Sequence, residues 1–203
     1  MNLSRWTCLL APLLAGCSSA PTHYYTLVPQ SERGPASAGT ARIRLDVQPV
    51  RIPAQVDRLE IVSRLSDGGM TIAENERWIA PVADELRHAL AARLLQRLEA
   101  RSPDGRGASE SLTVRLNVER FESSLSRYVL IEGSWRLEVR EGAEDVRIQC
   151  RTRAYEPVSR GYAELTRGYQ RAVTAIADEI ASVAQQASGG AAAQCPDSWG
   201  PPK

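Results

Sequence analysis

The stretch Leu112–Glu119 reads LTVRLNVE and alternates apolar with polar side chains. Side chains of a strand point alternately to its two faces, so this period of two predicts a strand with one buried and one wet face. Val129–Val139 and Val146–Ala154 repeat the pattern. The three segments predict an antiparallel meander, because such sheets commonly bury one face and leave the other in water.

Two long helices are predicted around this meander. Ile79–Arg101 carries apolar side chains every fourth residue, and Pro81 fits a first turn, where a missing N–H costs nothing. Tyr162–Ala187 carries a second apolar stripe, which Gly189 and Gly190 are expected to end. Shorter strands are predicted at Tyr24–Val28, at Arg42–Val50, and in a hairpin over 59–74.

These elements predict one two-layer α+β domain over residues 24–188. Its antiparallel or mixed sheet would carry both amphipathic helices on one face, and residues 189–203 would form a flexible tail. The hydrophobic fraction of 43% and the charged fraction of 24% exclude a mostly disordered chain and a multi-span membrane protein.

The charge balance argues against a nucleic-acid partner. Lysine and arginine number 25 against 24 acidic residues, and nucleic-acid binders usually carry a clear basic excess. Lys203 is the only lysine, so the basic residues are almost all arginine. Arginine grips phosphate groups well, but the scattered placement here favours solvated surface positions.

The N-terminal residues are typical of a secreted, lipidated protein. Met1–Arg5 carries a positive charge, and Trp6–Leu14 is an apolar run too short to span a bilayer. Leu14-Ala15-Gly16-Cys17 then resembles a bacterial lipobox, whose cysteine is acylated. We expect a signal peptide over 1–16, lipidation at Cys17 and a tether over 17–23. The alternative is an ordinary signal peptide that contains a cysteine.

Two further expectations follow from a mature chain in the periplasm. Ser18 follows Cys17 where an aspartate would signal retention in the inner membrane, so the periplasmic face of the outer membrane is expected. Cys150 and Cys195 form an even pair in an oxidising compartment, which predicts a disulfide. The alternative is two free thiols with Cys150 buried, because spacing alone does not fix geometry.

No set of residues predicts catalysis, a metal site or a cofactor. The two histidines, His23 and His88, lie far apart in the sequence, one near the tether and one on a helix. The sequence holds no Walker A loop, Cys-x-x-Cys or Gly-x-Ser-x-Gly motif. An enzyme needs a nucleophile with a base, a metal cluster or a cofactor loop, so we expect a non-enzymatic protein.

A succession of short motifs resembles the PqiC-like ABC-type transport auxiliary lipoproteins. The motifs are Tyr24-Tyr25-Thr26-Leu27, Val47–Pro53, Val56-Asp57-Arg58, Glu60–Arg64, Arg77-Trp78 with Pro81, and Gly133-Ser134-Trp135. The resemblance implies an auxiliary subunit of a lipid transport system that supports membrane integrity. It also implies self-association and a periplasm-spanning partner of the inner membrane with mammalian-cell-entry (MCE) domains. That partner would be served by an ABC permease and ATPase or by a multi-span inner-membrane protein. The tail with Cys195 departs from the family pattern.

Two places in these motifs carry open alternatives. Asp57 and Arg58 would either form an ion pair that fixes the bend after Pro53 or contact the partner. Trp78 would either anchor a partner interface or cover the core beside Pro81. Two other function classes remain as alternatives, a periplasmic lipid carrier and, less favoured, a cell-envelope hydrolase.

Overall fold

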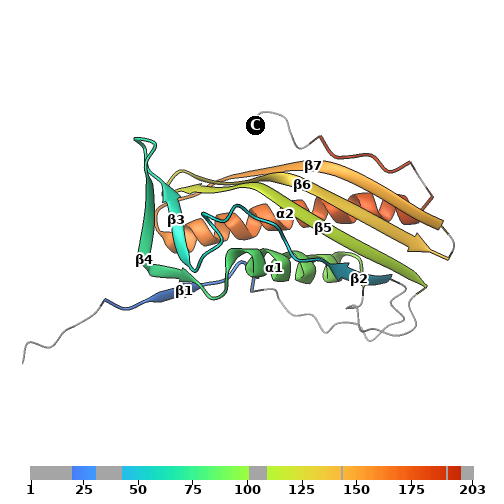
Figure 1. Ribbon diagram of the computed structural model, residues 1–203, viewed down its shortest axis with the longest axis horizontal. Coiled ribbons are helices and arrows are strands. Elements are labelled where there is room, and N and C mark those ends of the chain that lie inside the picture. Colours follow the sequence, from blue (N-terminus) through green and yellow to red (C-terminus); the bar gives the residue numbers. More distant parts are fainter. Residues whose placement is uncertain (1–19, 31–42, 101–108, 143, 191, 198–203) are drawn as a thin grey trace, which may run out of the picture.

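The computed structural model describes residues 20–30, 43–100, 109–142, 144–190 and 192–197. Its largest element is a four-stranded sheet in the order β2-β5-β6-β7 (Figure 1). These strands are β2 (Ile43–Val47), β5 (Glu110–Ser124), β6 (Tyr128–Glu141) and β7 (Glu144–Pro157). The strands β5, β6 and β7 form the predicted antiparallel meander, and β2 adds to it in parallel.

The β5 strand extends beyond the segment that its alternation predicts, because a bulge interrupts the alternation. The register with β6 shifts between Val118 and Arg120, so Glu119 is an extra residue. A bulge of this kind reverses which residues face the core. Before it Val118 is buried, and after it Phe121 and Ser123 are buried, which breaks the period seen in the sequence.

Gly133 on β6 lies opposite this bulge. A Cβ atom at this position would lie 2.3 Å from the backbone oxygen of Asn117 and 3.1 Å from Cα of Val118. Both neighbours are backbone atoms, so they cannot move aside as a flexible side chain would. Only glycine fits where the two strands approach this closely.

A second, three-stranded sheet has the order β1-β4-β3, with β1 (His23–Tyr25), β3 (Glu60–Arg64) and β4 (Met70–Trp78). The sequence predicts one sheet, whereas the structure holds two. The hairpin of β3 and β4 stands at one end of the large sheet (Figure 1). Ser63 of β3 meets β5 through its side chain, 3.1 Å from the hydroxyl of Ser123, rather than through a backbone ladder.

The helices α1 (Val82–Arg97) and α2 (Tyr162–Ser188) lie on the same face of the four-stranded sheet (Figure 1). Arg93 of α1 donates to both carboxylate oxygens of Asp178 on α2, at 3.0 and 2.9 Å. The α1 helix is shorter than predicted because Pro81 precedes it and Glu99 leaves the helical conformation with a φ of 47°.

Both sheets and both helices contribute to one hydrophobic core. The rings of Trp78, Phe121 and Tyr169 meet at the junction of the two sheets with α2, and Phe121 stacks on Tyr169 at 4.2 Å. The predicted α+β class is therefore confirmed, with the sheet in two parts.

Candidate functional site

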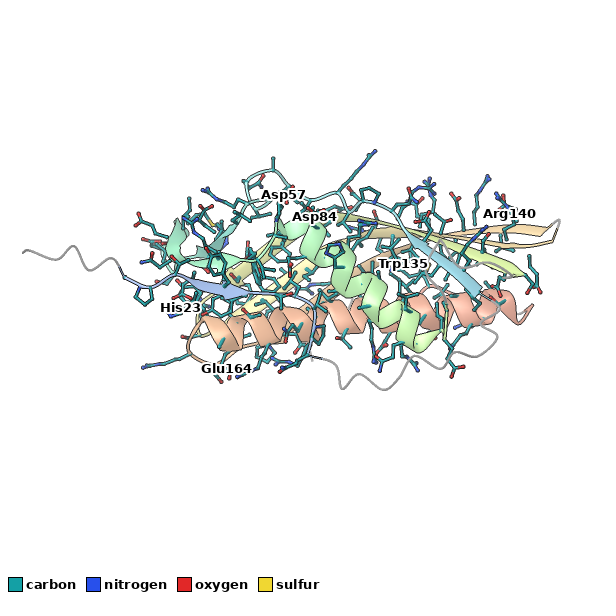
Figure 2. The ribbon with its side chains drawn as sticks, turned by 90° about the horizontal axis from the view of Figure 1, so that it is seen from below. His23, Asp57, Asp84, Trp135, Arg140 and Glu164 are labelled. Atoms are coloured by element: carbon teal, nitrogen blue, oxygen red, sulfur yellow. A yellow bond between two sulfur atoms is a disulfide. The ribbon has the colours of Figure 1, made fainter. Side chains whose placement is uncertain are left out.

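The chain enters the domain close to its expected anchor. Cys17 lies outside the described residues, which begin at Ala20, and β1 starts at His23. The β1 strand pairs in parallel with the end of β4, and the N–H of Ile79 donates to the carbonyl of Tyr25 at 2.8 Å. Figure 2 places His23 at one end of the molecule and Arg140 at the other.

A buried carboxylate, Glu85, holds the segment that follows β1. Glu85 is 3% exposed and lies in the first turn of α1. It accepts hydrogen bonds from the N–H of Leu27 and the hydroxyl of Thr26, both at 2.7 Å. The side-chain amide of Gln170 on α2 donates to the Thr26 carbonyl at 2.9 Å. Both helices therefore hold the segment that follows β1.

A second carboxylate, Glu76 of β4, holds β1 itself. The Tyr25 hydroxyl donates to Glu76 at 2.7 Å, and Nδ1 of His23 lies 3.0 Å from its other oxygen. Burial and the hydrogen bond to Glu76 raise the pKa of Tyr25 to about 12. Tyr25 thus stays a neutral donor under ordinary conditions.

The Asp57-Arg58 motif does not form the ion pair that one alternative expected. Asp57 accepts a hydrogen bond from the N–H of Ala83 at 3.0 Å, which satisfies a free donor of the first turn of α1. Arg58 pairs with Glu60 at 2.9 Å instead, and its hydrogen bond lowers the pKa of Glu60. Asp57 therefore links the bend to α1, while Arg58 remains on the surface with a 40% exposed side chain.

Trp78 belongs to the core. It is 1% exposed, and its ring meets that of Tyr169 edge to face at 5.8 Å. A side chain this buried cannot be a contact on the surface of the domain. The partner-interface alternative for Trp78 is corrected accordingly, because the end of β4 turns this ring inward.

A charge cluster around the buried Glu122 has no counterpart in the sequence predictions. Glu122 is 5% exposed and contacts Arg64 at 2.7 Å, Arg120 at 3.1 Å and the Tyr128 hydroxyl at 2.5 Å. Burial raises its pKa, but the donors from Arg64 and Tyr128 and the charge of Arg120 outweigh burial and leave that pKa below its ordinary value. The cluster fastens the hairpin of β3 and β4 to β5 and β6.

Sequence patterns carried only part of the signal for these two buried acids. Glu85 falls in the buried stripe of α1 with Val82 and Ala89. An acid within an apolar stripe could have indicated a buried carboxylate. Glu122 follows the bulge, where the alternation of β5 no longer indicates which face a residue takes.

The structure pairs Cys150 with Cys195, with the sulfur atoms 2.01 Å apart. Cys150 is a buried residue of β7, and the N–H of Gln194 donates to the side chain of Gln186 on α2 at 3.1 Å. The residues around Cys195 therefore return along the edge formed by β7 and α2.

The two histidines lie in different parts of the described structure. No group of three or more histidine, cysteine or acidic side chains there could hold a metal ion. A groove of about 130 Å³ lies between β2 and α1, where His88 lines it with Arg87 and Asp46, whereas His23 lies on β1 against Glu76. None of the helices described is long and apolar enough to cross a membrane.

A family model and two curated relatives match this chain. The model of the family described as ABC-type transport auxiliary lipoprotein component matches residues 25–181. The intermembrane transport lipoprotein PqiC of Escherichia coli (strain K12) is 30% identical over 142 residues, which cover 66% of this chain and 74% of that protein. PqiC of Shigella flexneri matches equally.

Solved structures share the fold. A crystal structure of an uncharacterized protein superposes with a TM-score of 0.57 at 21% identity, covering 80% of this chain and 97% of that one. Protein XCC0632 from Xanthomonas campestris gives a TM-score of 0.53 at 16% identity, covering 75% and 92%. The match over residues 25–181 confirms the resemblance carried by the motifs: the chain belongs to the family of ABC-type transport auxiliary lipoprotein components.

Proposed function

We propose that this lipoprotein is anchored through acylated Cys17 at the periplasmic face of the outer membrane. There it acts as a non-catalytic subunit of an intermembrane lipid transport system that includes an MCE-domain protein. The family match over residues 25–181 carries the proposal, since the curated relatives are named intermembrane transport lipoproteins. The lipobox-like Leu14-Ala15-Gly16-Cys17 supports the anchor.

The contacts of Glu85 and Gln170 support a role that depends on the tether. They fasten the segment after the tether to α1 and α2, so that the anchor and the core would move together. Changing Cys17→Ser should leave an unprocessed precursor and remove the chain from outer-membrane fractions. Normal processing and fractionation of that variant would contradict the anchor.

The partner is tested by purification from cells with a tag on the C-terminal tail. We expect an MCE-domain protein to co-purify with the wild-type chain and the chain to run as a homo-oligomer. Arg58→Glu tests the exposed residue of the Asp57-Arg58 motif, with Arg147→Glu on β7 as a control of equal charge change. Failure of the wild-type chain to retain an MCE-domain protein would overturn the proposed partner.

The lipid-carrier alternative receives no support from the cavities described. The groove between β2 and α1 holds about 130 Å³, whereas pockets for small ligands usually hold about 300–1,000 Å³. The apolar side chains of both helices fill the core instead. The protein would act through surfaces and the tether rather than by enclosing a lipid.

A further inference from the structure

Two exposed apolar side chains lie where the chain enters the domain. Tyr24 is 63% exposed and Ile79 is 66% exposed, more than any other large apolar residue described. Exposed side chains of this size at one place usually mark a contact surface, whereas scattered ones need no explanation. The two residues belong to adjoining segments, since Ile79 N–H donates to the carbonyl of Tyr25.

Strand alternation places Tyr24 and Arg77 on the same side of the sheet. Tyr24 pairs in register with Arg77, so both side chains point to one face. Trp78 points to the opposite face, into the core. Ile79 follows in the bend after β4, and its N–H still donates to the carbonyl of Tyr25 on β1. Tyr24, Arg77 and the exposed Ile79 are therefore neighbours at this end of the domain, here called the anchor-end face.

Arg77 places a guanidinium on this face, where its Nε donates to the backbone carbonyl of Glu74 at 3.1 Å. Arg77 lies 3.6 Å from Glu60, and the same carboxylate pairs more closely with Arg58 at 2.9 Å. One carboxylate thus faces two guanidinium groups. Arginine binds phosphate groups bidentately, and tyrosine suits a boundary between water and an apolar phase.

The length of the tether decides what can cover the anchor-end face. Six peptide units separate Cys17 from His23 and span at most about 20 Å. The α2 helix alone, with 27 residues, is about 40 Å long. Because His23 and Arg140 lie at opposite ends of the molecule (Figure 2), a membrane that holds Cys17 adjoins the end that carries Tyr24 and Ile79.

We propose that the anchor-end face contacts the phospholipid surface, with Tyr24 and Ile79 at the level of the headgroups and Arg77 on lipid phosphate. This inference rests on the proposed acylation of Cys17. It goes further by fixing which end of the domain faces the membrane.

The test uses the full lipoprotein, purified from membranes and reconstituted in vesicles of phosphatidylethanolamine and phosphatidylglycerol with brominated acyl chains. An Ile79→Trp chain reports on the face, and Val146→Trp is the control. Val146 is 40% exposed and pairs with Val139, next to Arg140 at the far end. The fluorescence of each variant is measured in brominated and in plain vesicles. The signal of the parent chain is subtracted in both, so that only the introduced tryptophan is compared.

We expect brominated lipid to quench the tryptophan at position 79 and not the one at position 146. Adding Arg77→Gln should reduce that quenching. Equal quenching at both positions, or none at position 79, would overturn the inference. Aqueous iodide, which quenches exposed tryptophan, gives a second test. The inference is also overturned if vesicles leave the tryptophan at position 79 open to iodide and only an added protein partner protects it. A wild-type chain that does not float with vesicles refutes the anchor itself, whereas flotation without quenching refutes the contact face alone.

Discussion

The carboxylate of Glu85 lies 2.7 Å from the backbone nitrogen of Leu27, although 58 positions separate the two residues. Both are buried, Leu27 completely. This contact joins the segment after β1 to the first turn of α1, where the helix dipole favours a negative charge. It makes the entry of the chain part of the core rather than a loose extension.

Replacing Glu85→Ala should lower the free energy of unfolding by about 2 kcal/mol, because it leaves the buried N–H of Leu27 without an acceptor. Urea unfolding of the purified domain measures this change. Asp84→Ala is the matched control, since Asp84 is an exposed acid in the same turn and should cost no more than about 0.5 kcal/mol. Equal losses in both variants would show that Glu85 acts only through the helix dipole.

The meander and the helices were predictable from single segments, whereas the pairing between segments was not. Alternation in Leu112–Glu119 and the four-residue period before Arg97 each report one local environment. The parallel pairing of β1 with β4 and of β2 with β5 joins residues far apart in the sequence. A local period does not encode which distant strand a segment pairs with. The division into two sheets depends on these pairings and was therefore not predictable.

Whether a residue lies in the core or on the surface was less predictable than the helices and strands, because burial also depends on contacts between distant segments. Trp78 and Arg58 occur in one family-like succession, yet the first is buried and the second exposed. Asp57 caps a helix that begins 25 residues later in the sequence, at Val82, which only the tertiary structure reveals. Lipidation of Cys17 stays a prediction, made from the lipobox-like residues, which are a local signal.

The Glu122 cluster should make stability fall in acid. The pKa of Glu122 is lowered in the folded protein, so its stabilisation is present above its ordinary value of 4.5 and is lost as the pH falls through the lower folded value. We expect Glu122→Gln to be destabilising at pH 7 and its deficit relative to wild type to shrink below about pH 4.5. Unfolding in urea over a pH series measures both.

Tyr128→Phe tests the same cluster from the donor side. It removes the hydrogen bond from the tyrosine hydroxyl but keeps Arg64 on the carboxylate, so it should weaken the acid dependence without abolishing it. A stability difference between Glu122→Gln and wild type that stays constant from pH 7 into acid would contradict this account.

The pair Cys150 and Cys195 predicts a protein without free thiols in the folded domain. The bond would close a loop between residues 45 positions apart, worth on the order of 4 kcal/mol in the chain-entropy model. Thiol labelling of the denatured mature protein, without reductant, should find neither residue reactive. Labelling of both would refute the bond, and labelling after reduction is the positive control.

Gly133→Ala should destabilise the domain at the bulge of β5. The new methyl group would lie 2.3 Å from the carbonyl oxygen of Asn117, and the strands must separate to admit it. Overpacking of this kind costs about 1–3 kcal/mol, and we expect the upper part of that range because the neighbours are backbone atoms. Gly69→Ala is the control, since a methyl group there meets chiefly the movable side chains of Asp67 and Leu65. Thermal unfolding of both variants checks this, and a Gly133→Ala chain as stable as Gly69→Ala would show that β5 and β6 are not held this close.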